Sequence, residues 1–374
     1  MSRANENIRA DHVGSLLRPP ELLAARAQAS EGALPAAKLR EIEDKAILDI
    51  LRMQQDSGIQ VFSDGEYRRS GWYGGFCDVV QGFVPYERTM PAIWKGDSSK
   101  VAAADFSKSG SFAVGARLQL DGRFTGAEAA FLVKHAPLPF KVTLPSPASY
   151  QQFFEPGFSD RAYNSPDEML GDIVEICKRE VAALVEDGVP YIQIDSLRYG
   201  DVIDAGRRAR WEARGVKPMD IVAQTLAADN AVLAMAKSRG IVRAMHICRG
   251  NYRSAWAGEG GYEPVAEKML GELDVDRFLL EFDDARSGGF EPLRFVPRGK
   301  IVVLGLVTTK TGALESVDEL RRRVDEAAKY LPLEQLAIGT QCGFASSDLG
   351  NLLSMDDQRR KLELIATVAR SIWS

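Results

Sequence analysis

Short apolar runs recur along the chain, and most are followed by a segment with the 3.6-residue period of an amphipathic helix. The apolar runs are Ile8–Val13, Gln60–Ser63, Phe140–Leu144, Tyr191–Ile194, Val242–Met245, Phe278–Phe282, Ile301–Leu306 and Leu336–Gly339. The helix-period segments include Leu39–Ser57, Pro166–Asp187, Asp220–Arg239, Tyr262–Leu273 and Ser316–Lys329. Continuous apolar strands that alternate with helices are typical of a parallel sheet buried on both faces. Eight such strands predict an α/β fold of the closed (β/α)₈ (TIM) barrel type, with a doubly wound open sheet as the alternative.

The spacing of the runs is uneven at one place, where residues 67–139 separate the second run from the third. Within this gap Phe112–Phe124 alternates and contains Asp121-Gly122, a hairpin turn signal, and a helix is expected at Gly126–His135. The first part of the gap is aromatic, with Trp72, Tyr73, Phe76, Phe83, Tyr86 and Trp94. We therefore expect one domain over residues 1–374, with a β-hairpin and aromatic insertion that packs against the barrel. A lid over the substrate is the alternative role for this insertion.

Composition and charge exclude several classes of protein. The chain has 374 residues, 45% hydrophobic and 26% charged, with a net charge of −5. This charge argues against a nucleic-acid partner, because phosphate binding requires a concentrated basic surface. No apolar run has the length of a membrane span, and the first residues show no apolar signal core. Four cysteines in a chain of this size indicate free thiols in a reducing cytoplasm. A homo-oligomer is compatible with these features.

Candidate metal ligands follow three of the predicted strands. His246 and Cys248 are two residues apart, so in an extended segment they point to the same side. Cys342 follows the last predicted strand, and Glu281 lies at the end of the sixth. Zinc accepts cysteine sulfur, histidine nitrogen and carboxylate oxygen, which predicts a Zn²⁺ site here. The alternative for the histidine and its neighbouring thiol alone is ordinary core packing, which is also what we expect for Cys177.

Other strand ends carry residues suited to a small polar substrate. Asp64 and Glu66 follow the second strand and could hold an ammonium group, or simply form a turn with a surface ion pair. Gly14 and Ser15 follow the first strand and offer a backbone N–H and a hydroxyl to an anion. Asp195 is the ionisable residue at the end of the fourth strand, where burial without a partner would be costly, so we expect it to be catalytic.

Seven motifs, taken in order, resemble the catalytic barrel of cobalamin-independent methionine synthases and, more closely, the single-barrel relatives of these enzymes. The motifs are DHVGSLLRP, GIQVFSDGEYRR, YIQIDS, MHICRGN, FLLEFDDARSG, VVLGLVTTKTG and IGTQCGFAS. The resemblance covers nearly the whole chain. It implies a zinc ion bound by His246, Cys248, Glu281 and Cys342, with an incoming thiol that loses its proton as it joins the metal.

The same resemblance implies how the thiol substrate is held. Ser15 and the neighbouring amides would bind the carboxylate of homocysteine, Glu66 would bind its ammonium group, and Asp195 would face the reacting sulfur. The chain departs from the family pattern at the methyl-donor side. Val307 stands after the seventh strand, where the family has a histidine that protonates the leaving pterin, and Ser196-Leu197-Arg198 replaces a Glu-Pro sequence.

These observations predict a zinc-dependent transfer of an alkyl group to a small thiol, with methylation of homocysteine to methionine as the default reaction and the donor left open. One alternative is an epoxyalkane:coenzyme M transferase, since this enzyme is similar to the same single-barrel group. It would need cations for a sulfonate, and the candidates are Arg18, Arg68, Arg69, Arg198 and Arg249. The other alternative is a non-catalytic barrel with a structural zinc ion.

Overall fold

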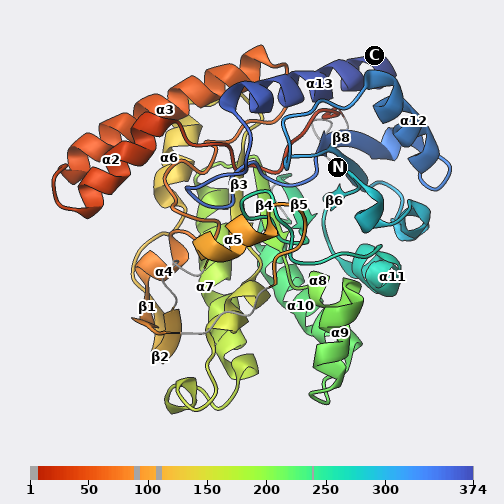
Figure 1. Cartoon of the computed structure of the whole chain (residues 1–374). Helices are drawn as coiled ribbons and strands as arrows, with labels where there is room; N and C mark the ends of the chain where they lie inside the picture. The colour runs from red at the N-terminus through yellow and green to blue at the C-terminus, as the bar shows by residue number, and fades with distance from the viewer. Residues whose placement is uncertain (1–6, 88–92, 107–111, 238–239, 374) are drawn as a thin grey trace.

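Six parallel strands form the centre of the protein and lie side by side in their chain order (Figure 1). The computed structural model describes residues 7–87, 93–106, 112–237 and 240–373. The strands are β3 (Lys141–Pro145), β4 (Tyr191–Ser196), β5 (Val242–Ile247), β6 (Arg277–Glu281), β7 (Ile301–Val307) and β8 (Leu336–Thr340). Each begins within a residue of its predicted position. The register pairs Asp195 with His246, so the carboxyl ends of neighbouring strands meet at one edge.

Residues 8–13 and 60–63 close the sheet into a ring between β8 and β3. Ala10 forms a parallel bridge to β8, and Phe62 forms one to the residue that precedes β3. The two segments also contact each other, because the amide of Gln60 donates to the carbonyl of Ala10 at 3.1 Å. The closed (β/α)₈ arrangement therefore holds, with six strands in regular ladders and two segments that contribute single bridges.

Side chains explain why the first two segments do not form regular strands. The amides of Arg9 and Ala10 both donate to Oε1 of Gln60, at 2.6 and 2.9 Å. The amide of Ser63 donates to Oε1 of Gln54 at 3.0 Å. A side-chain acceptor satisfies a backbone amide without extending a ladder. The apolar pattern predicted the path of these segments, but it could not show that glutamine oxygens would take their amides.

Helices surround the ring. They are α2 (Pro20–Ser30), α3 (Ala36–Asp56), α4 (Phe76–Val79), α5 (Ser99–Phe106), α6 (Gly126–His135), α7 (Pro166–Glu186), α8 (Gly200–Ile203), α9 (Ala205–Glu212), α10 (Pro218–Leu233), α11 (Glu263–Glu272), α12 (Val317–Ala327) and α13 (Met355–Trp373). Short 3₁₀ helices occur at Pro147–Phe153, Ser159–Arg161, Ala234–Ala236, Ala285–Ser287, Glu291–Phe295 and Leu333–Gln335. The predicted helices are confirmed, although α10 ends before the predicted limit, and Ser238 and Arg239 lie outside the described residues. No helix in the described ranges is long and apolar enough to cross a membrane.

The insertion contains a two-stranded antiparallel ribbon, β1 (Val80–Pro85) and β2 (Phe112–Leu120), beside α4 (Figure 1). The predicted position of the hairpin turn at Asp121-Gly122 is wrong. The alternating segment is one strand that pairs with residues upstream of it, and the chain after Asp121 enters α6 directly. The predicted helix at Gly126–His135 has the same bounds as α6.

Alternate residues of each strand point into the barrel. On β4 these are Tyr191, Gln193 and Asp195. A chain of polar contacts crosses the interior here: Nζ of Lys141 lies 2.9 Å from both Oδ1 of Asp11 and Oε1 of Gln193. Nε2 of Gln193 then donates to Oδ1 of Asp195 at 2.7 Å. The buried interior is therefore connected to the edge of the sheet where the candidate site lies.

A buried carboxylate on α10 contacts the segments that follow β3 and β4. Asp229 accepts hydrogen bonds from the hydroxyls of Ser146, at 2.6 Å, and Tyr199, at 2.9 Å. Burial raises the pKa of Asp229 to about 7, although both hydroxyls act to lower it. Because the folded state then binds a proton that the unfolded state has lost, this group makes stability fall as the pH rises from about 4 to 7.

We therefore expect the stability of Asp229→Asn, measured relative to the native chain, to improve as the pH is raised from 5 to 8. The asparagine carries no charge, so it lacks the cost of ionising a buried carboxyl group. Urea unfolding of both proteins at the two pH values measures this change. A difference in unfolding free energy that stays constant with pH would contradict the assignment.

Candidate metal centre and substrate cavity

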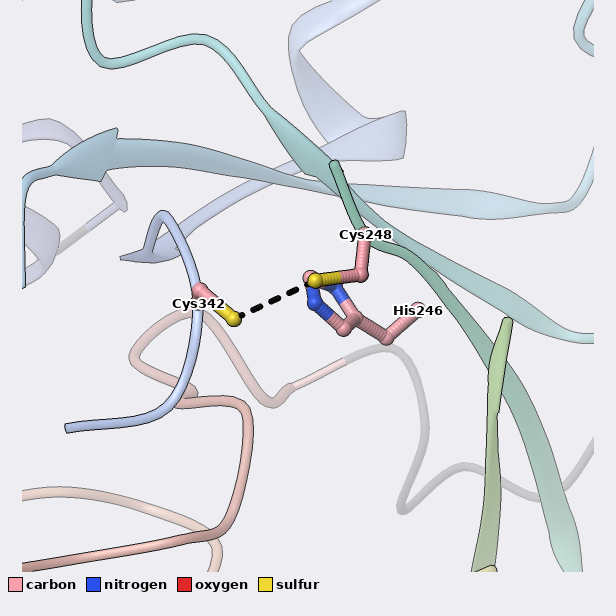
Figure 2. Close-up of side chains that lie close together, drawn as sticks. All are labelled: His246, Cys248 and Cys342. Atoms are coloured by element: carbon pink, nitrogen blue, oxygen red, sulfur yellow. Dashed lines mark hydrogen bonds between the residues drawn. The ribbon is translucent and has the colours of Figure 1, made fainter. Parts of the chain in front are cut away.

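The tightest group of metal-binding side chains comes from the ends of β5 and β8. His246 lies on β5 and Cys248 one residue beyond it, where the amide of Cys248 still donates to Ser196 at 2.9 Å. Cys342 follows β8 by two residues. Figure 2 shows that these three side chains point toward one another from the two sides of the barrel mouth. Their donor atoms all lie within 4.8 Å of one another, and among the described residues they are the group that fits a metal ion.

The hydrogen bonds of this group leave its donor atoms facing each other. Nδ1 of His246 contacts the carbonyl oxygen of Leu279 at 3.1 Å, whereas Nε2 is buried without a hydrogen-bond partner. The sulfur atoms of Cys248 and Cys342 are 3.5 Å apart (Figure 2). A histidine fixed through one ring nitrogen by a carbonyl, with the other nitrogen free, is the usual arrangement of a zinc-ligating histidine. These residues therefore fit a zinc ion.

The protonation of the group agrees with this fit. A hydrogen bond from Cys342 lowers the pKa of the Cys248 thiol to about 6, and the pKa of Cys342 is raised by the same contact. Burial acts to lower the pKa of His246, but Cys248 and then Asp195 outweigh it and raise that pKa to about 9. These shifts favour a thiolate at Cys248 beside a protonated His246, and a divalent cation would displace the remaining protons.

Glu281, the fourth expected ligand, lies at the end of β6 outside this tight group of three. Its Oε1 accepts from the amide of Arg249 at 2.6 Å, and its Oε2 accepts from Gln341 at 2.8 Å and Arg286 at 3.3 Å. Burial would raise the pKa of Glu281, but Arg286 and Arg249 keep it below its ordinary value. The carboxylate is charged and adjacent to the group, and both of its oxygens already accept hydrogen bonds.

The three metal-binding candidates line a cavity of about 530 Å³ at the mouth of the barrel, together with Ser15, Glu66 and Asp195. Gly14 and Asp64 do not line it. Gly14 has a φ of +138° and turns the chain so that Ser15 faces the cavity. The sequence thus located these strand ends. The structure shows that Ser15, Glu66 and Asp195 line the cavity, whereas Gly14 and Asp64 lie beside lining residues without lining it themselves.

Glu66 lines this cavity and keeps one carboxylate oxygen without a hydrogen-bond partner. Its Oε1 accepts from the hydroxyl of Thr143 at 2.9 Å, and its Oε2 is buried without a partner. The backbone of Glu66 has a φ of +61°, a conformation that is uncommon for residues other than glycine. Oδ1 of Asp64 accepts from the amide of Glu66 at 2.9 Å and so stabilises this conformation. An unpaired carboxylate oxygen in a cavity is suited to a substrate ammonium group.

Asp195 faces the same space and is partly exposed to it. Burial raises the pKa of its carboxyl to about 7, the nearby His246 acts to lower it, and Glu66 adds to the rise. Ser15 lies beside the loop that carries Cys342. A Cβ on Gly343 would lie 1.9 Å from the hydroxyl oxygen of Ser15, so a side chain at this position would displace that hydroxyl.

Some cavity residues were not identified from the sequence. Asn251 and Tyr252 follow the His-x-Cys motif and line the cavity, and Nζ of Lys310 is 3.0 Å from Oδ1 of Asn251. The aromatic insertion packs against the barrel as expected, but Trp72 and Trp94 also line the cavity. The proximity of Asn251 and Tyr252 to Cys248 in the chain was the available signal for these two residues. For the insertion, the signal was its aromatic composition, which gave a role over the substrate only as the alternative.

Comparisons with known proteins agree with this geometry. Residues 156–364 match the family model described as the catalytic domain of cobalamin-independent synthases. The Bacillus subtilis (strain 168) protein YxjH is 36% identical over 98% of this chain and 94% of its own length. A methionine synthase of Pyrococcus abyssi is 24% identical over 90% of this chain and 86% of its own.

A solved structure extends the likeness to the whole fold. The putative vitamin-B12 independent methionine synthase of Listeria monocytogenes has a TM-score of 0.72 and 25% identity, and the alignment covers 98% of each chain. Family, fold and the clustered His246, Cys248 and Cys342 therefore lead to one conclusion. The chain belongs to the cobalamin-independent methionine synthase catalytic-domain family, whose members are methyltransferase-type enzymes with a TIM-barrel fold.

Proposed function

We propose that this protein catalyses a zinc-dependent transfer of an alkyl group to a small thiol, with methylation of homocysteine to methionine as its reaction. The observation that carries this proposal is that His246, Cys248 and Cys342 converge at the wall of a cavity that is also lined by Glu66, whose carboxylate keeps one unpaired oxygen. A thiol and an ammonium group on one small molecule would fit these two features together.

In this proposal His246, Cys248 and Cys342 hold the zinc ion, with Glu281 as the fourth ligand once its hydrogen bonds are exchanged. Zinc in such a site lowers the pKa of a thiol that joins it, so that the sulfur is a thiolate at neutral pH. Glu66 binds the ammonium group, and Ser15 with the neighbouring amides binds the carboxylate. Asp195, fixed by Gln193, lies at the side of the cavity where the sulfur is expected.

The same geometry argues against the two alternatives. The five arginines that could bind a sulfonate have internal partners: carbonyl oxygens for Arg18 and Arg249, and carboxylates for Arg68, Arg69 and Arg198. None of them lines the cavity, which disfavours coenzyme M. A structural zinc site would be closed by protein ligands, whereas all three candidate ligands here face open space.

X-ray absorption at the zinc edge tests the proposal directly. The spectrum of the zinc-loaded protein is expected to gain a sulfur neighbour when homocysteine is added, and to remain unchanged with coenzyme M. A spectrum that no thiol changes would favour the structural role. A sulfur neighbour gained with coenzyme M alone would favour the epoxide reaction.

Replacement of Glu66 by glutamine is expected to weaken homocysteine binding by roughly ten- to a hundredfold. The change removes a charge-assisted hydrogen bond to the ammonium group, which is worth about 1.5–3 kcal/mol. Isothermal titration calorimetry on the zinc-loaded protein measures the effect. The matched ligand is 4-sulfanylbutanoate, which is homocysteine without its amino group, and its affinity should be the same for both proteins. Equal losses for the two thiols would show that Glu66 does not bind the ammonium group.

A further inference from the structure

The cavity is acidic as well as apolar. Its described lining residues include the carboxylates Glu66, Asp78, Asp195 and Asp348 but no lysine or arginine. Glu66 and Asp348 form ion pairs with arginines behind the wall, and Asp195 lies beside His246, but no lysine or arginine among the described residues faces the cavity itself. An anionic co-substrate would be repelled by this charge, and a cationic one would be attracted.

Aromatic side chains form much of the wall. Seven of the thirty described lining residues are aromatic, against 8% of the whole chain, so the enrichment is local to the cavity. The seven are Trp72, Tyr73, Trp94, Phe106, Phe112, Phe153 and Tyr252. Trp94, Phe106 and Tyr252 make one cluster, with each ring centroid 5.3–5.4 Å from the other two. We call this cluster the aromatic triad.

Two contacts fix the aromatic triad to the loop that carries the metal ligands. Tyr252 lies four residues after Cys248 on that loop. The neighbouring Lys95 and Trp256 form an antiparallel bridge, with amide-to-carbonyl distances of 2.7 and 3.3 Å. Arg253 also forms an ion pair of 2.9 Å with Asp105 at the end of α5. The insertion therefore places two rings against the same loop that brings Cys248 to the cavity.

Aromatic faces and carboxylates together are suited to a cation that carries methyl groups. The face of an aromatic ring attracts a cation, and aromatic side chains recognise quaternary ammonium groups in this way. We propose that the alkyl donor is a small onium compound, a sulfonium or quaternary ammonium ion, whose charged centre binds at the aromatic triad. This inference depends on the proposed function, because it identifies the second substrate of that transfer.

The chemistry balances without a further reactant. The thiolate sulfur of the acceptor forms a bond to the methyl carbon with its own electron pair. The bond between that carbon and the onium sulfur or nitrogen breaks, and its electron pair returns to the onium atom, which leaves as a neutral sulfide or amine. The thiol proton goes to solvent. A neutral leaving group needs no proton from the enzyme. This agrees with the lining, because His246, a candidate metal ligand, is the single histidine among the described lining residues, and no second histidine is present there to donate a proton.

Binding of two probes of equal shape tests the cation site. Choline and 3,3-dimethylbutanol differ in charge but hardly in volume, and each is titrated calorimetrically into the zinc-loaded protein. We expect choline to bind at least about tenfold more tightly, and we expect Trp94→Leu and Tyr252→Leu to remove most of this preference. Phe131→Leu is the matched control, because its ring on α6 does not line the cavity. Equal binding of the two probes by the native protein would overturn the inference.

Turnover separates this inference from the proposed function. Homocysteine methylation is measured with trimethylsulfonium, S-methylmethionine, methyltetrahydrofolate and methylcobalamin as donors, after zinc and homocysteine binding have been verified. Transfer from a sulfonium supports the inference, with a KM for this donor that rises in Tyr252→Leu while the KM for homocysteine does not. Transfer from the pterin or the corrinoid alone would overturn the inference and leave the proposed function intact. Failure to bind zinc or any thiol would overturn both.

Discussion

Replacing Cys342 by serine is expected to remove nearly all bound zinc and to lower alkyl transfer by about a thousandfold or more, equivalent to roughly 4 kcal/mol of transition-state stabilisation. The hydroxyl of serine stays protonated at neutral pH and is a poor substitute for a thiolate ligand. The change also removes the partner that lies 3.5 Å from the sulfur of Cys248. Zinc content per chain and initial rates with homocysteine measure the two effects. His246→Ala is expected to act in the same way, because it removes the free Nε2.

The matched control for this substitution is Cys177→Ala. Cys177 is also buried, at 2% exposure, but it lies on α7 outside the cluster. The control should keep its zinc and its activity. Circular dichroism and urea unfolding should show a folded barrel in every variant, because the cluster lies at the mouth and not in the apolar core. Full activity of zinc-free Cys342→Ser would refute the assignment of the metal centre.

Replacing Lys141 by methionine is expected to destabilise the fold by about 3–5 kcal/mol. Lys141 and Asp11 are both fully buried and form an ion pair of 2.9 Å inside the barrel. Removal of the lysine leaves the carboxylate of Asp11 in a low-dielectric interior with Arg277 at 3.7 Å and the hydroxyl of Tyr191 at 3.0 Å. Urea unfolding measures the loss. Activity should fall as well, because Gln193, which positions Asp195, loses the donor to its Oε1.

The control for Lys141 is the same substitution at an exposed pair. Lys268 and Glu272 form an ion pair of 3.0 Å along α11, with side chains 33% and 56% exposed. Pairs of this kind contribute less than about 1 kcal/mol, so Lys268→Met should change stability little. Equal small losses at the buried and exposed sites would show that the buried pair does not stabilise the barrel.

The cavity shows where sequence reasoning reached its limit. Trp94 and Phe106 lie more than a hundred residues from Tyr252 in the chain, so no spacing rule relates them. Only the tertiary structure, through the bridge between Lys95 and Trp256 and the contacts between the rings, shows that they meet at the cavity. In the same way, the alternation in Phe112–Leu120 identified a strand but not its partner. The sequence of one strand does not show which other segment pairs with it, and here the partner lies upstream.

The sequence by itself determined the barrel and the candidate metal ligands at its mouth. Apolar runs alternating with helical periods require a parallel sheet that is covered by helices, and parallel strands place the residues that follow them at one common edge. The sequence therefore predicted that His246, Cys248 and Cys342 lie close together. The tertiary structure alone decided which carboxylates remain free. Glu66 keeps an unpaired oxygen in the cavity, whereas Glu281 is engaged by Arg249, Gln341 and Arg286. The two carboxylates differ because their hydrogen-bond partners come from distant parts of the chain. The hydrophobic periodicity of the strands does not predict which residues these partners are.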